Sequence, residues 1–146
     1  MKRHASLVTL SREHHGALIL AQLLKKDAPV YKGLPTEPGS KGDYAFLYYR
    51  DELNSHFEQE EQVVIKMTKG MSEELDQLAG EIILEHKALR QLFNTISRAR
   101  NLDAHLDQLG CLLERHIRKE ERELFPMIQA LCSETLLTEI EKALSA

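Results

Sequence analysis

The same phrase, His-x-x-x-Glu-Glu, occurs twice in the sequence, at residues 56–61 and again at residues 116–121. Residues four apart share one face of a helix, so each histidine lies beside the first glutamate of its phrase. Imidazole nitrogens and carboxylate oxygens are both common metal ligands. The phrase therefore predicts two helices that each present a His–Glu pair, His56 with Glu60 and His116 with Glu120, to a metal ion.

Two further histidines lie in segments of helical periodicity that match each other. Residues 10–14 pair with residues 82–86, and both segments end in Glu-His, at His14 and His86. The chain thus repeats a helix with one inward histidine followed by a helix with His-x-x-x-Glu. This repetition implies a pseudo-two-fold site on the axis of a helical bundle.

The apolar periodicity predicts an all-α fold, an up-down-up-down four-helix bundle with a short extra C-terminal helix. We expect helices at about 7–26, 43–69, 73–100 and from 103 onward, with Pro126 kinking or closing the fourth, and a final helix after Ser133. The stretch from Pro29 to Gly42 has the composition of a loop. The expected inner faces of the second and fourth helices include Phe46, Met67 and Met127.

Length and composition predict one soluble domain over residues 1–146. Apolar residues make up 42% and charged residues 29%, and the net charge of −4 argues against nucleic-acid binding. No apolar stretch could span a bilayer, and residues 1–6 lack the apolar run of a signal peptide. We therefore expect a cytoplasmic protein with no membrane partner. Cys111 and Cys132 are too few for a disulfide framework.

Burying a carboxylate without a partner costs roughly several kcal/mol. The pattern shows no inward lysine or arginine that could be that partner. A bound cation would remove that cost. Four histidines and two glutamates without a thiolate suit iron or manganese, and zinc less well. Two ions bridged by Glu60 and Glu120, and by an oxo or hydroxo group, would keep open positions for dioxygen, nitric oxide or peroxide.

Together these residues resemble the hemerythrin-like (HHE cation-binding) domain family. The resemblance rests on Glu13-His14, His56-x-x-x-Glu60, Glu85-His86 and His116-x-x-x-Glu120, with the run Glu123-Leu124-Phe125-Pro126 after them, and it covers nearly the whole chain. It implies a four-helix bundle around two non-haem iron ions. The ligands that it implies are His14, His56, Glu60, His86, His116 and Glu120.

The chain departs from the oxygen-carrying hemerythrins in two places. Those proteins have a second histidine one turn after the ligand of the third helix, where this chain has Arg90. Their fourth-helix carboxylate lies five residues after its histidine, a spacing that would select Glu121 here. The resemblance therefore implies a protein that binds O2, NO or peroxide in oxygen, nitric oxide or iron sensing or in a stress response. The alternative is a di-iron enzyme of iron-sulfur cluster repair or of peroxide or NO detoxification.

Three choices stay open at this point. His15 is an alternative to His14 on the first helix, and Glu121 is an alternative to Glu120 on the fourth. Tyr49, two turns before His56, either packs at the edge of the core or donates its hydroxyl to the site.

Overall fold

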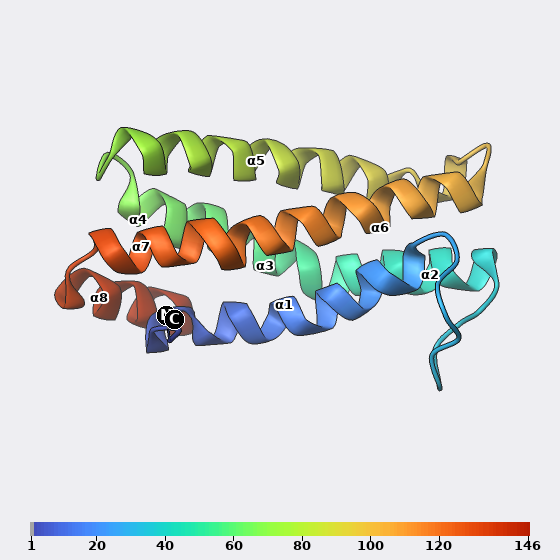
Figure 1. Ribbon diagram of the computed structural model, residues 1–146, viewed down its shortest axis with the longest axis horizontal. Coiled ribbons are helices and arrows are strands. Elements are labelled where there is room, and N and C mark those ends of the chain that lie inside the picture. Colours follow the sequence, from blue (N-terminus) through green and yellow to red (C-terminus); the bar gives the residue numbers. More distant parts are fainter. Residues whose placement is uncertain (1) are drawn as a thin grey trace.

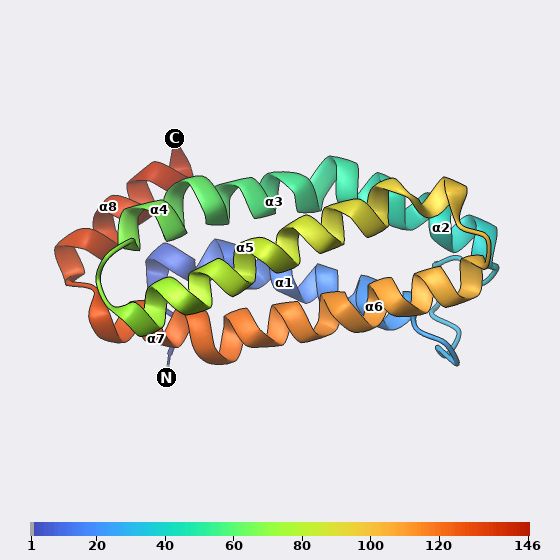
Figure 2. The same ribbon diagram turned by 90° about the horizontal axis from the view of Figure 1, so that it is seen from above.

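The computed structural model describes residues 2–146, which form an elongated bundle of antiparallel helices (Figures 1 and 2). The four long rods run up, down, up and down, and a short helix, α8, turns back at the end of the bundle where both termini lie. The elements are α1 (Ala5–Leu24), α2 (Pro38–Tyr48), η1 (Tyr49–Leu53), α3 (Asn54–Gln59), η2 (Glu60–Ile65), α4 (Lys66–Thr68), α5 (Glu73–Asn94), η3 (Ile96–Arg98), α6 (Leu102–Lys119), η4 (Glu120–Leu124), α7 (Phe125–Leu131) and α8 (Glu134–Ser145). α1 is the first rod, α2 through α4 form the second, α5 is the third, and α6 through α7 form the fourth. The predicted bundle with its extra helix is confirmed.

Local sequence sets the helix boundaries. The side chains of Ser72, Asn101 and Ser133 each accept a hydrogen bond from a backbone N–H of the first turn of α5, α6 and α8. The second rod begins at Pro38, inside the stretch predicted as loop, because proline at the first helical position needs no N–H partner. The fourth rod passes through Pro126 and ends at Leu131.

Three π-helical turns interrupt the second and fourth rods, at Tyr49–Leu53, Glu60–Ile65 and Glu120–Leu124. A π-helical turn holds one residue more than an α-helical turn, so it shifts the buried face by one position. The expected inner position of Phe46 was therefore wrong, because Phe46 is exposed and Ala45 beside it is buried. Met67 and Met127 are half-buried and pack against the core, while their neighbours Thr68 and Ile128 are fully buried.

The apolar core is divided into two clusters along the bundle axis. One cluster includes Leu20, Phe93 and Leu109, toward the end where α2 begins. The other includes Leu10, Ile82 and Phe125, toward α8. Along the chain, His14, Glu60, His86 and Glu120 lie between residues of the two clusters, and His56 and His116 lie within one turn of that boundary. The polar site therefore occupies a gap in the core. Among residues 2–146 no helix has the length and apolarity needed to cross a membrane.

α6 comes close to the backbone of α1 at Gly110. A Cβ added at Gly110 would lie 2.6 Å from the carbonyl oxygen of Ala21 and 3.1 Å from the Cβ of Leu24. Real Cβ atoms do not approach a carbonyl oxygen so closely, so the absence of a side chain here permits the α1–α6 contact.

We expect Gly110→Ala to destabilise the protein although alanine is the better helix former. Overpacking at a helix contact costs about 1–3 kcal/mol, which exceeds the gain of about 1 kcal/mol in helix propensity at most such sites. Gly80, in the middle of α5, is the matched control because a Cβ there meets nothing within 4 Å. Denaturant unfolding should show Gly80→Ala more stable than wild type and Gly110→Ala less stable. Equal gains in both variants would contradict this view of the α1–α6 contact.

Candidate metal centre

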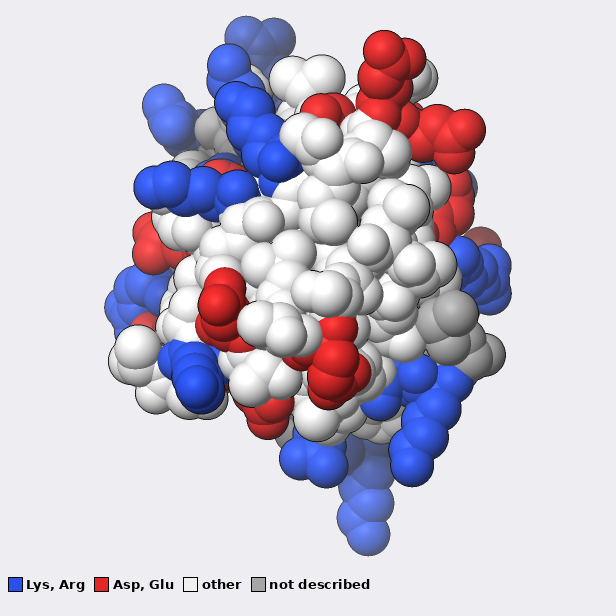
Figure 3. Space-filling model, turned by 90° about the vertical axis from the view of Figure 1, so that its left-hand side faces the viewer, with Lys and Arg blue, Asp and Glu red and all other residues white. Residues whose placement is uncertain are grey.

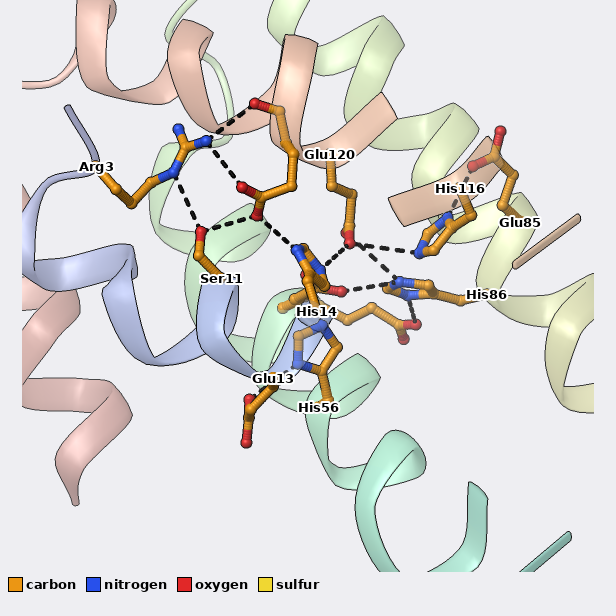
Figure 4. Close-up of polar contacts among 12 residues, drawn as sticks. Arg3, Ser11, Glu13, His14, His56, Glu85, His86, His116 and Glu120 are labelled. Carbon is orange, nitrogen blue, oxygen red and sulfur yellow. Dashed lines mark hydrogen bonds and ion pairs between the residues drawn. The ribbon is translucent and has the colours of Figure 1, made fainter. Parts of the chain in front are cut away.

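Six buried side chains from all four rods meet in the gap between the two apolar clusters (Figure 4). α1 provides His14, α3 provides His56, α5 provides His86 and α6 provides His116, while Glu60 and Glu120 begin the π-helical turns η2 and η4. Each of the six is no more than 2% exposed. The structure thus brings together all six residues that the sequence predicted as ligands.

The six side chains form two groups of four that share both carboxylates. One group is His14, His56, Glu60 and Glu120, and the other is Glu60, His86, His116 and Glu120. Within each group the possible ligand atoms lie within 4.8 Å of one another. The Nε2 atoms of His56 and His86 lie 3.1 Å and 3.0 Å from the two oxygens of Glu60. Each group could hold one cation, with the two glutamates between the two positions.

Most of the inward-facing atoms have no hydrogen-bond partner. Although the histidine nitrogens and carboxylate oxygens are close, their directions do not suit hydrogen bonds for six of them. The unpartnered atoms are Nε2 of His56, His86 and His116, both oxygens of Glu60, and Oε2 of Glu120. Buried polar atoms in native proteins nearly always have partners, so this cluster of exceptions requires an explanation. A bound cation would serve as the partner of these nitrogen and oxygen atoms, which point toward common positions.

Each of the four histidines turns its other nitrogen, Nδ1, to a second carboxylate. We refer to Glu13, Glu61, Glu85 and Glu121 as the outer glutamates. The Nδ1 contacts join His56 to Glu13 at 2.9 Å, His86 to Glu61 at 2.6 Å, His116 to Glu85 at 2.8 Å, and His14 to Glu121 at 2.6 Å. Such a carboxylate fixes the tautomer and orientation of an imidazole so that Nε2 faces the metal position.

Cationic side chains hold three of the outer glutamates. Arg3 binds Glu121 at 3.0 Å, Arg90 binds Glu61 at 2.8 Å, and Lys119 binds Glu85 at 2.5 Å. Arg90 also lies over the ring of Phe57, which stacks on His86. At the position where oxygen-carrying hemerythrins have a further histidine, this chain therefore has a side chain that supports an outer glutamate.

The buried charges change the pKa values of the site in a consistent direction. Burial lowers the pKa of His56, but Glu60 and Glu13 outweigh that effect and raise it to about 9. Burial also lowers the pKa of His86, but contacts with the carboxylates of Glu120, Glu60 and Glu61 outweigh burial and raise it to about 11. The pKa of Glu60 is held well below its usual range, because the histidines around it outweigh the effect of burial. In the absence of metal, protons on His14, His56 and His86 thus offset negative charge of the buried glutamates.

The structure places the residues that the sequence left as alternatives in clearly different positions. His14 is buried in the cluster, whereas the neighbouring His15 is exposed. Glu120 points inward, and Glu121 contacts His14 from outside. Tyr49 packs against Phe93, and its hydroxyl accepts a hydrogen bond from Asn94, so it lies at the core edge and takes no part in the cluster.

Sequence reasoning kept Glu121 only as an alternative metal ligand and assigned no role to the other three outer glutamates as partners of the histidines. A signal for them was present, because a glutamate directly precedes both His14 and His86 and the second glutamate of each His-x-x-x-Glu-Glu phrase repeats. Periodicity placed Glu61 and Glu121 off the inner face, which is correct. It gave no indication that they reach a histidine on another rod.

Comparison with known proteins agrees with this geometry. The family model of the hemerythrin HHE cation binding domain matches residues 7–128, and a second, overlapping match covers residues 77–142. No curated protein and no solved structure matches the chain. The family match spans most of the chain and includes all six side chains of the buried cluster. The chain therefore belongs to the hemerythrin HHE cation-binding family.

Proposed function

We propose that the chain holds two non-haem iron ions between its four rods and binds a small ligand, O2, NO or peroxide, at that centre. The observation that carries the proposal is the pair of four-residue groups that share Glu60 and Glu120. Shared carboxylates suit two neighbouring ions, since each glutamate has two oxygens and both can serve as ligands. An oxo or hydroxo bridge between the ions would complete the centre.

The donor set favours iron over zinc. All six side chains offer nitrogen or oxygen, and neither Cys111 nor Cys132 belongs to either group. Structural zinc sites are closed tetrahedra, commonly with thiolates, whereas iron and manganese accept five or six ligands of mixed nitrogen and oxygen type. Two histidines and two shared carboxylates give each ion four protein ligands, which leaves room for a bridge and an exogenous ligand. Such an open centre supplies reversible binding of, or electron transfer to, a small molecule.

The protein's own contribution is to orient the donors and exclude bulk water. The outer glutamates hold the four imidazoles with Nε2 inward, and Phe57 and Phe125 stack on His86 and His14. The two apolar clusters close the site along the bundle axis. These features support a role in sensing oxygen, nitric oxide or iron, or in a stress response.

Metal analysis of the purified protein tests the proposal directly. We expect two irons per chain, one for each group of donors, and a visible absorption band that changes on reduction and on exposure to O2 or NO. His56→Ala and His116→Ala should each deplete the metal, and His15→Ala, which changes an exposed histidine of α1, should not. One zinc per chain, or no metal, would refute the proposal. Two manganese ions would refute the choice of iron. Steady turnover of peroxide or NO would identify an enzyme.

The outer glutamates should contribute to metal affinity without binding the ions. Replacing such a carboxylate costs about 10- to 100-fold in affinity at other metal sites, and we expect a loss in that range for Glu121→Ala. Glu123→Ala is the matched control, because Glu123 is an exposed glutamate on the same rod. Competition with a chelator measures both affinities. Equal affinities in the two variants would show that the contact with His14 has no supporting role.

The stability of the metal-free protein should have its maximum on the acid side of neutrality. The folded pKa of His56, about 9, exceeds its ordinary value of 6.5, so its stabilising effect is complete below pH 6.5 and disappears as the pH rises through 9. The folded pKa values of Glu85 and Glu121, about 2, lie below their ordinary value of 4.5. Their stabilising effect is present above pH 4.5 and disappears as the pH falls toward 2.

Denaturant unfolding of the metal-free protein at a series of pH values should therefore show greatest stability between pH 4.5 and 6.5. Metal binding requires neutral imidazoles, so the extra stability of the loaded protein should grow as the pH rises above 6.5. A metal-free protein that gains stability between neutrality and pH 9 would contradict the charge balance described above.

A further inference from the structure

The four outer corners of the metal cluster are alike in their His–Glu contact but differ in what lies outside it. Arg3, Arg90 and Lys119 cover the carboxylates of Glu121, Glu61 and Glu85. At the remaining corner, the carboxylate of Glu13 contacts His56 and has no lysine or arginine partner among residues 2–146. The Glu13 side chain is 41% exposed, whereas the other three outer glutamates are 18–28% exposed. The corner at Glu13 is thus the most open of the four.

A surface cavity of about 120 Å³ lies at this corner, and His56 is part of its wall. The cavity is lined by Arg12, Glu13, Gly16, Tyr48, Glu52, Leu53 and His56. A water molecule occupies about 30 Å³ in the liquid, so the cavity has room for a cation with a few of its waters. The Nε2 atom of the same His56 is buried, faces the metal cluster and has no hydrogen-bond partner. One imidazole therefore separates the cavity from the cluster.

Two carboxylates, of Glu13 and Glu52, lie in the cavity wall, with Arg12 as its one lysine or arginine side chain. His56 adds a positive charge to the wall while its ring is protonated and none once it binds a metal. Burial raises the pKa of the Tyr48 hydroxyl, and so do the charges of Glu52, Tyr44 and Glu13. The Tyr48 hydroxyl lies against Gly16, where any side chain would collide with it, as a Cβ would be 2.4 Å away. A polar, acidic opening of this kind suits a hydrated cation.

The other directions are less suitable for a cation. Both ends of the bundle axis are filled by apolar clusters, and the end face at α8 has a broad uncharged centre (Figure 3). The four other prominent cavities of the described residues include no member of the metal cluster in their walls. At the corner related to Glu13 by the internal repeat, Lys119 binds the outer glutamate, and Leu112 stands at the position that matches Glu52.

From these observations we propose that divalent metal ions reach and leave the centre at the His56 corner, through the cavity between α1 and the second rod, drawn in by Glu52 and Glu13. This inference rests on the proposed metal centre. Glu13 and Glu52 are positioning residues on this route, and neither belongs to the two groups of candidate ligands. Removing a charge at the opening should slow the passage of a cation and leave the equilibrium metal content unchanged.

The test variant is Glu52→Gln, because Glu52 is exposed and contacts no candidate ligand among the hydrogen bonds and ion pairs of residues 2–146. Glu58→Gln is the matched control. Glu58 is also exposed, and it contacts Asn54 on a different face of the same rod. The metal-free full-length proteins are mixed anaerobically with Fe²⁺, and bound iron is followed with time. Removal of iron from the loaded proteins by a chelator gives the reverse rate.

We expect Glu52→Gln to slow iron loading about two- to fivefold at low ionic strength, and Glu58→Gln to load at the wild-type rate. The difference should disappear at high salt, since screening weakens surface attraction. Wild-type loading in Glu52→Gln, or equal slowing in both variants, would overturn the route. The route would also be overturned if the loaded Glu52→Gln protein bound the neutral ligand NO more slowly than wild type while its iron loading was unchanged. A wild-type protein that binds no iron at equilibrium would instead refute the proposed function.

Discussion

Two carboxylates, Glu60 and Glu120, lie fully buried in the middle of the bundle, and this is the constraint on which the rest of the structure depends. A buried charge is tolerated only with partners of opposite charge or hydrogen-bonding groups around it. Here those partners are four imidazoles, one from each rod. Because they come from every rod, the carboxylates require the complete bundle, and the polar site divides the apolar core into two clusters. Without metal, protons on His14, His56 and His86 provide positive charge, and this makes the stability of the metal-free state dependent on pH.

The outer glutamates extend the same balance of charge to the surface. Each histidine lies between an inner and an outer carboxylate, so its ring has no freedom to turn away. The π-helical turns serve this arrangement, because Glu60 and Glu120 must point inward while the next residue reaches a histidine on a neighbouring rod. The extra residue in each turn also keeps the following apolar positions, Ile65 and Phe125, in the core. π-helical turns are rare elsewhere and often lie at functional sites.

The sequence predicted the bundle and the six inward residues because both follow from α-helical spacing. His56 and Glu60, four apart, share a face regardless of what surrounds them. The differences arose where the spacing changes, because α-helical periodicity was continued through π-helical turns that no single residue indicates. Phe46 was expected inside and is exposed, whereas Met67 and Met127 are half-buried against the core rather than fully buried in it. The outer contacts were missed for a different reason. Glu121 and His14 are 107 residues apart in the chain, and they meet only because their two rods pack together.

The two halves of the chain match at the six inner residues of the site and differ at the outer corners. This difference separates the requirements of metal binding from those of metal access. Two equivalent cation positions need equivalent donors, so His14, His56 and Glu60 have counterparts in His86, His116 and Glu120. Access needs no such equivalence, and one opening is enough for a buried site. Cations on three corners stabilise the outer glutamates and also repel incoming metal ions. A lysine or arginine paired with Glu13 would add about 0–1 kcal/mol, as exposed ion pairs do, and would add positive charge to an opening whose wall already contains Arg12. The lack of such a pair at Glu13 among residues 2–146 is thus a small loss of stability at the corner where an incoming cation would benefit most from a carboxylate that no lysine or arginine holds.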